Sequence, residues 1–157
     1  ESPGLSSAPA IAKMVREILE EEGLRCKRKM NFNPYRQVNI KFMELPLEEQ
    51  RRLVKQNPNY GRVICRCETI TEGEIIEAIR RPLGARDLDG VKRRTRAGMG
   101  RCQGGFCGPR VTEILARELK IPLNQVTKHG RASYILDGKT KDLGVMQEGG
   151  SNRNGKL

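Results

Sequence analysis

The fold is decided by GMGRCQGGFCGP at residues 98–109 together with VICRCETITEGE at residues 63–74. These two stretches hold four of the five cysteines, as a C-x-C pair at Cys65 and Cys67 and a C-x4-C pair at Cys102 and Cys107. A disulfide within C-x-C would close a very short, strained ring, and secreted disulfide scaffolds are usually shorter and richer in cysteine. In an intracellular chain, paired cysteines more often bind metal or carry out redox chemistry.

A helix is predicted directly after the first cysteine pair. Thr71 and Glu74 have the spacing of a capping box, in which the threonine hydroxyl accepts the Glu74 amide and the Glu74 carboxylate reaches back. The pattern predicts a helix that runs to about Arg80, because Pro82 and Gly84 then break it.

Two further helices are predicted on either side of the second cysteine pair. The segment 89–97 predicts a helix with Asp89 as its cap and Gly98 at its end. Pro109 suits the first turn of a helix that continues to about residue 119. We therefore expect a mainly α fold: a small helical domain in which both cysteine pairs lie in loops, immediately before helices, around a metal centre.

The loops around the cysteines favour thiolate chemistry. The positive end of a helix stabilises thiolates and a bound anionic centre, and glycine lets backbone N–H groups come close to sulfur. Arg66, Arg101 and Arg110 add positive charge beside the cysteines. This setting suits a [2Fe–2S] cluster, because four thiolates give the cluster a net negative charge.

Zinc is the alternative metal. Four cysteines suit tetrahedral zinc, but zinc sites usually show C-x2-C spacing, so spacings of one and four favour an iron–sulfur cluster and leave zinc open. Inert buried cysteines would explain poorly why both pairs lie in loops at helix starts. Cys26 stands alone between Arg25 and Lys27, and we assign it no role.

The segment ahead of the cysteines predicts a helix, a short strand and a second helix. Apolar residues at helical spacing predict an amphipathic helix over 9–22, and its apolar face has no obvious partner. Residues 37–42 alternate between apolar and polar side chains and predict a strand. Pro46 then opens a helix through about Gln56.

Turn-forming residues at 57–61 mark a domain boundary. We therefore expect three segments, 1–60, 61–130 and 131–157, of which the last has few apolar residues in its final part and predicts a flexible tail. The chain begins with Glu1 rather than Met, so we expect a fragment of a longer protein. No apolar run is long enough to span a membrane, and no signal-peptide pattern is present.

The chain is strongly basic, with a formal net charge of +11. Such a balance often indicates nucleic acid or another anionic partner, and the dense basic run is Lys92, Arg93, Arg94 and Arg96. No aromatic residues alternate with this run, and a solvated helix face or an acidic partner explains it adequately. We therefore expect no nucleic-acid partner.

The cysteine motifs resemble those of a known family. CRCETITEGE from residue 65 and DGVKRRTRAGMGRCQGGFCGP from residue 89 resemble the bacterioferritin-associated-ferredoxin-type [2Fe–2S] domain, over about residues 60–130. More narrowly, they resemble the form found at the C-terminus of FAD-dependent dehydrogenases of the anaerobic glycerol-3-phosphate dehydrogenase type. The resemblance implies that the cluster ligands are Cys65, Cys67, Cys102 and Cys107, and it favours iron–sulfur over zinc more strongly than the spacing does.

The start of the chain carries a second part of the resemblance. ESPGLSSAPAIA at residues 1–12 resembles the last part of the FAD domain in those enzymes, which implies that segment 1–60 is the remnant of that domain plus a linker. Near the flavin of the parent enzyme would then lie Ser2, Pro3, Gly4 and Leu5. No G-x-G-x-x-G motif follows a strand, so we assign no catalytic residue and do not expect the fragment to oxidise substrate alone.

The function implied is that of an electron-transfer module that passes electrons from flavin to an acceptor. Its expected partners are the rest of the parent flavoenzyme and a redox acceptor protein or quinone-linked subunit. The unpartnered face of helix 9–22 also predicts self-association or partial disorder of the isolated fragment. The expected location is the cytoplasm, or the inner membrane face through a partner. The alternative function is a structural zinc-binding or docking module with the same four cysteines.

Overall fold

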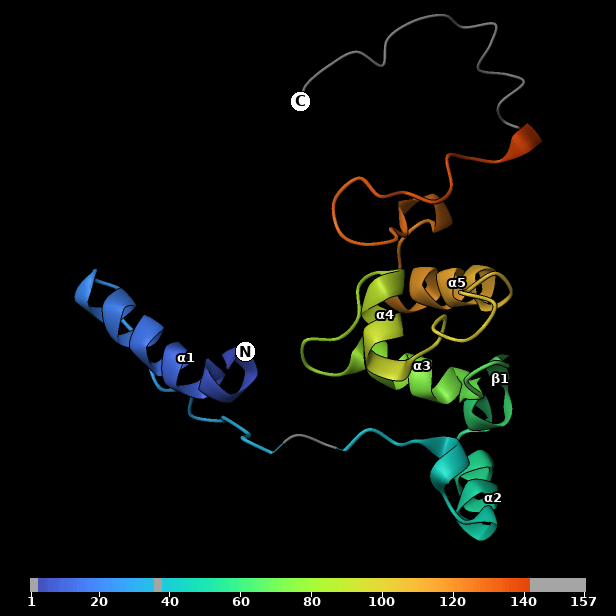
Figure 1. The fold of residues 1–157 in the computed structure, drawn as a ribbon, viewed down its shortest axis with the longest axis horizontal. Helices are drawn as coiled ribbons and strands as arrows, with labels where there is room; N and C mark the ends of the chain where they lie inside the picture. The colour runs from blue at the N-terminus through green and yellow to red at the C-terminus, as the bar shows by residue number, and fades with distance from the viewer. Residues whose placement is uncertain (1–2, 36–37, 142–157) are drawn as a thin grey trace, which may run out of the picture. The chain divides into compact units, whose positions relative to one another are not determined.

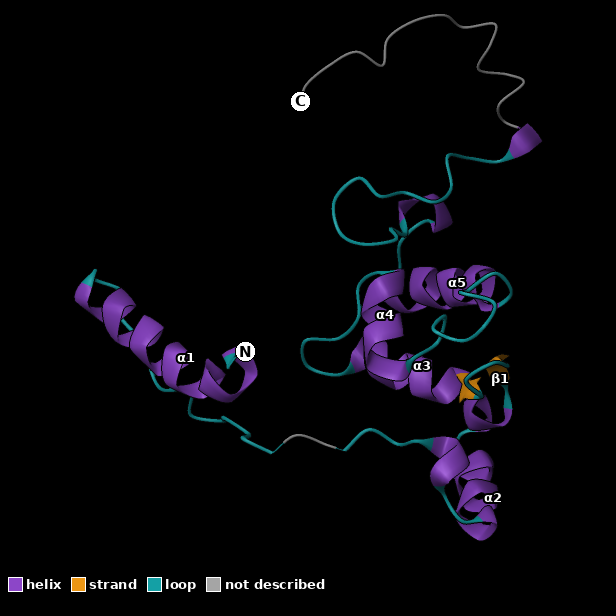
Figure 2. Ribbon diagram, viewed as in Figure 1, coloured by secondary structure: helices purple, strands orange, loops and turns teal. Residues whose placement is uncertain are grey.

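A computed structural model describes residues 3–35 and 38–141 of the chain. Contacts divide the chain into two compact units, residues 1–38 and residues 39–157. The expected three segments, with boundaries after residues 60 and 130, stay a prediction, and most of the predicted tail, residues 142–157, lies outside the described residues. The described part is built mainly of helices, with one small sheet of two strands (Figure 2), which confirms the mainly α fold.

The first unit contains one long helix, α1 (Gly4–Glu21). It confirms the helix predicted over 9–22 but begins five residues earlier, and Pro9 lies inside it. After the helix, Gly23 takes a φ of 95°, a left-handed conformation that glycine adopts without strain. None of the described residues of α1 is buried. The apolar side chains along one face are roughly half-exposed: Ile11, Met14, Val15, Ile18 and Leu19.

The second unit opens with a segment that is not the predicted strand. Among the described residues of 37–42, Asn39 to Lys41 form no strand, and the 3₁₀ helix η1 (Phe42–Glu44) follows them. The buried Phe42 stacks on Tyr60 with ring centroids 5.9 Å apart, and its amide donates to the Glu74 carboxylate at 3.3 Å. The alternating apolar and polar pattern therefore reflects the burial of Phe42 against Tyr60 and not the pairing of a strand in a sheet.

Two short helices and a strand lead to the first cysteines. The helix predicted after Pro46 is confirmed as α2 (Leu47–Gln56), and the 3₁₀ helix η2 (Pro58–Gly61) follows it. The strand β1 (Val63–Cys65) then pairs in antiparallel fashion with β2 (Ile70–Thr71). Cys65 is therefore the last residue of a strand, whereas the sequence pattern predicted a loop at this position.

Three helices complete the cysteine-bearing part of this unit: α3 (Glu72–Arg80), α4 (Leu88–Thr95) and α5 (Cys107–Leu119). The capping box of Thr71 and Glu74 is present at the start of α3 as predicted. The cap of α4 is Asp87 and not Asp89, because the Asp87 carboxylate accepts the Gly90 amide at 2.5 Å. The 3₁₀ helix η3 (Leu123–Gln125) comes after α5.

The core of the second unit lies between α3, α4 and α5, which pack together (Figure 1). Each helix supplies a fully buried side chain: Ile75 from α3, Val91 from α4 and Leu115 from α5. Cys65 and Cys107 belong to the same buried cluster. Half of the cysteine set is therefore part of the hydrophobic core. None of the helices in the described residues is long and apolar enough to cross a membrane.

Candidate metal centre

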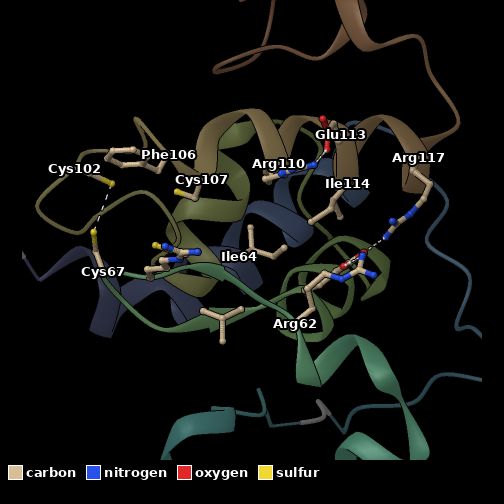
Figure 3. Close-up of a pocket in the computed structure, with 14 residues that line it drawn as sticks. Arg62, Ile64, Cys67, Cys102, Phe106, Cys107, Arg110, Glu113, Ile114 and Arg117 are labelled. Atoms are coloured by element: carbon tan, nitrogen blue, oxygen red, sulfur yellow. Dashed lines mark hydrogen bonds and ion pairs between the residues drawn. The ribbon is translucent and has the colours of Figure 1, made fainter.

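All four paired cysteines line one hollow of about 810 Å³ (Figure 3). Cys65 ends β1 and Cys107 begins α5, and these two are only 1% and 2% exposed. Cys67 is exposed in the turn after β1, and Cys102 is half-buried in the glycine-rich turn before α5. Both motifs thus present their cysteines to the same space, at two different depths.

One contact between sulfur atoms joins the two motifs. The Cys67 Sγ atom lies 3.5 Å from the Cys102 Sγ atom. Cys65 and Cys107 line the buried part of the hollow and belong to the same hydrophobic cluster. Cys26, by contrast, is exposed in the first unit and lines no part of this hollow.

The two depths give the thiols different acidities. The backbone N–H of Phe106, the Cys67 thiol and the N–H groups of Gly104 and Gly105 all donate to Cys102, and they lower its pKa below the usual value of a thiol. Burial, with the neighbouring Cys65, raises the pKa of Cys107 to about 11. Backbone amides therefore stabilise a thiolate at the outer position, whereas the inner position gains a thiolate only beside a compensating cation.

Gly100 lies against Cys67, which the sequence alone did not predict. A Cβ atom built on Gly100 would lie 2.2 Å from the Cβ atom of Cys67. Bonded neighbours aside, carbon atoms do not approach so closely, so only glycine lets the turn lie against Cys67. The sequence shows many glycines around Cys102, but it does not indicate which of them lies against a cysteine.

Arginines line the hollow beyond the sulfur atoms. Arg66 and Arg110 do so as expected from the sequence, but Arg101 is exposed and does not line it. At the opposite end, Arg62 and Arg117 both donate to the buried carboxylate of Glu72, at 2.8 Å and 2.7 Å (Figure 3). This ion-pair group was not foreseen, because its members are 10 and 45 residues apart and no local pattern links them.

The arrangement fits a binuclear cluster better than a single ion. Two thiolates on one tetrahedral metal, each about 2.3 Å from it, are separated by about 3.8 Å. The 3.5 Å between Cys67 and Cys102 is close to that separation. Within residues 3–35 and 38–141, no group of three or more His, Cys, Asp or Glu side chains is arranged to hold one metal ion. A single zinc ion thus receives no support, whereas two cysteine pairs suit two irons.

Comparison with known proteins agrees with this chemistry. Residues 63–117 match the family described as the BFD-like [2Fe–2S] binding domain. A glycerol 3-phosphate dehydrogenase of Caloramator mitchellensis is 58% identical over 141 residues, which are 90% of this chain and 29% of that protein. An opine oxidase subunit of Rhizobium meliloti is 52% identical over 89 residues, 56% of this chain and 16% of that subunit.

A third relative matches over a shorter segment. It is one subunit of the anaerobic glycerol-3-phosphate dehydrogenase of Escherichia coli K12, 42% identical over 55 residues, 35% of this chain and 10% of that subunit. The chain therefore spans less than a third of the length of these relatives. No solved structure matches it. The matched segment contains β1, the capping box of α3 and all four paired cysteines, and residues 63–117 of this chain belong to the family of BFD-like [2Fe–2S] binding domains.

Proposed function

We propose that this chain is the electron-transfer part of a longer flavin-dependent dehydrogenase, and that its four paired cysteines hold a [2Fe–2S] cluster. One observation carries the proposal: four thiols from two distant motifs line one hollow, two of them with sulfur atoms 3.5 Å apart, inside the segment that matches the [2Fe–2S] family. A bound cluster would supply a centre that accepts and returns one electron at a time. The protein would fix its ligands, its charge environment and its exposure.

The surroundings of the outer cysteines are suited to a centre that gains negative charge. Backbone N–H groups of Gly104, Gly105 and Phe106 point to Cys102, and they need no rearrangement when an electron arrives. Arg66 and Arg110 line the same hollow. Both features favour the reduced state and raise the reduction potential, since the added charge meets positive ends of dipoles and cations.

The rest of the proposal concerns the parent protein. Two of the relatives above are named glycerol 3-phosphate dehydrogenases and one is named an opine oxidase, so we propose a parent that oxidises a small metabolite through FAD. The start of the chain would then approach the flavin. Pro3 lies at the N-cap position of α1, Gly4 and Leu5 are its first residues, and Ser2 lies outside the described residues. This fragment would not oxidise substrate by itself.

The acceptor would be a redox protein or a quinone-linked subunit, in the cytoplasm or at the inner membrane face. The proposed partners are therefore the remainder of the flavoenzyme and this acceptor. Two of the relatives are named as subunits, which supports a role within a larger assembly.

The test is metal analysis of protein purified without oxygen. We expect two irons and two acid-labile sulfides per chain and charge-transfer absorption in the visible range. Cys102→Ser should lose the cluster, whereas Cys26→Ser, a matched substitution at a cysteine outside the hollow, should keep it. Zinc without sulfide that persists after anaerobic reconstitution with iron and sulfide would contradict the proposal.

A further inference from the structure

We propose that the cluster ligands divide by depth and not by motif. Cys67 and Cys102 share an outer iron, Cys65 and Cys107 share an inner iron, and Gly100 is the positioning residue that holds the outer pair together. This inference rests on the proposed function, since it assumes a [2Fe–2S] cluster at the four cysteines. The motifs alone suggest the opposite division, in which each iron would take the two cysteines that are neighbours in sequence.

The outer pair is defined by distance. Its sulfur atoms are 3.5 Å apart although their residues are 35 positions apart in the chain. This separation is close to the roughly 3.8 Å between two thiolates on one tetrahedral metal. The pair is already near the geometry that a single iron requires.

The inner pair is defined by burial. Cys65 and Cys107 are 1% and 2% exposed and belong to the same hydrophobic cluster. The other member of each motif is more exposed. Division by depth gives one iron the two buried ligands and the other iron the two more exposed ligands, whereas division by motif would give each iron one of each kind.

Gly100 explains how the outer pair stays together. A side chain at this position would overlap Cys67, because a built Cβ atom lies 2.2 Å from the Cβ and 3.4 Å from the Sγ of that cysteine. The φ angle of Gly100 is not in the left-handed region, so φ does not by itself require glycine at this position. What the site requires from this glycine is space, and alanine would push Cys67 away from Cys102.

The first test leaves the protein unaltered. The full chain with its cluster is reduced by one electron with dithionite, and the β-proton signals of each ligand cysteine are followed by NMR against temperature. In a reduced cluster with one ferric and one ferrous iron, the ligands of the two irons have opposite temperature dependences. We expect Cys67 to behave like Cys102, and Cys65 like Cys107. Pairing of the signals by motif would overturn the inference and leave the proposed function standing.

The second test uses substitutions and does not depend on localised valence. Serine replaces each of the four cysteines in turn, and the electron paramagnetic resonance spectra of the reduced variants are compared. The spectra should fall into the same two pairs as the NMR signals. Spectra that group by sequence motif, or that form no pairs, would overturn the division of the ligands by depth. Failure of the unaltered protein to assemble iron and sulfide would instead defeat the proposed function.

Gly100→Ala tests the positioning role. We expect a several-fold lower iron occupancy after reconstitution, with the remaining cluster showing shifted signals for Cys67 and Cys102 and unshifted signals for the inner pair. Gly108→Ala is the matched control, because it adds the same methyl group beside Cys107 with nothing within 4 Å. Equal effects of the two substitutions, or an equal shift of all four cysteines in Gly100→Ala, would show that Gly100 does not position Cys67.

Discussion

Replacing Thr71 with valine removes one hydroxyl from the start of α3 and nearly preserves the volume of the side chain. The hydroxyl accepts the Glu74 amide at 3.4 Å and donates to the Glu74 carboxylate at 2.8 Å. That carboxylate is also bonded to the amides of Thr71, at 2.8 Å, and Phe42, at 3.3 Å. The substitution therefore removes a helix cap and leaves a buried carboxylate with two of its three donors.

The expected loss follows from these two contributions. Loss of an N-cap costs about 1 kcal/mol, and a hydrogen bond to a charged group contributes about 1.5–3 kcal/mol. Because one hydroxyl serves both interactions, the contributions overlap, and we expect the free energy of unfolding to fall by about 2–3 kcal/mol in total. At about 4–8 °C per kcal/mol for a domain of this size, the melting temperature should drop by roughly 10–20 °C.

Urea unfolding of the full chain, followed by far-ultraviolet circular dichroism, measures this change. Thr112→Val is the control, since Thr112 is as buried as Thr71 and its hydroxyl donates only to the Gly108 carbonyl, one turn earlier in α5. Its removal should cost about 0.5–1 kcal/mol. If the two valine variants lost the same stability, the capping box would not be what holds the start of α3.

Three further outcomes are expected. Gly73→Ala should lower the melting temperature, because its new methyl group would lie 2.7 Å from the buried ring of Tyr60, an overlap costing about 1–3 kcal/mol; Gly108→Ala, with nothing within 4 Å, should not. Burial raises the pKa of Glu118, but hydrogen bonds from Arg80 and Arg117 outweigh this effect and leave the pKa lowered. Stability from this carboxylate is therefore present above its ordinary pKa near 4.5 and is lost as pH falls through the lower pKa of the folded state. In urea unfolding, the loss of stability caused by Glu118→Gln at pH 7 should therefore shrink toward pH 3. A loss of stability that stays constant with pH would contradict this. The exposed apolar face of α1 predicts concentration-dependent association in sedimentation velocity, and a monomer with an ordered α1 would contradict it.

The parts of the fold that the sequence predicts are those that local rules decide. Thr71 and Glu74 form their capping box from residues three positions apart, so the start of α3 could be read directly. The helix after Pro46 was equally local. The four cysteines were recognisable as one set because their spacing is unusual, and the hollow brings them together.

The sequence-based predictions that were wrong failed because of contacts between residues far apart in the chain. Asp87 caps α4 in place of Asp89 because its carboxylate also accepts the Gly130 amide, 43 residues away. Asp89 pairs with Lys128 and Lys92 instead, which lowers the pKa of its carboxyl group. The alternating segment before residue 43 lacked a strand partner, and Phe42 stacks on Tyr60 instead. No local pattern carries such information.

The inner cysteines have a consequence for the speed of electron transfer. Cys65 and Cys107 are held by the same close-packed side chains that hold the three helices together. When the charge of a bound centre changes by one, ligands fixed in this way move little, and little water near them must reorient. The reorganisation energy of a bound cluster would then be small, which would lower the activation barrier for electron transfer. The packing that stabilises this domain would thus also favour fast electron transfer at the proposed cluster.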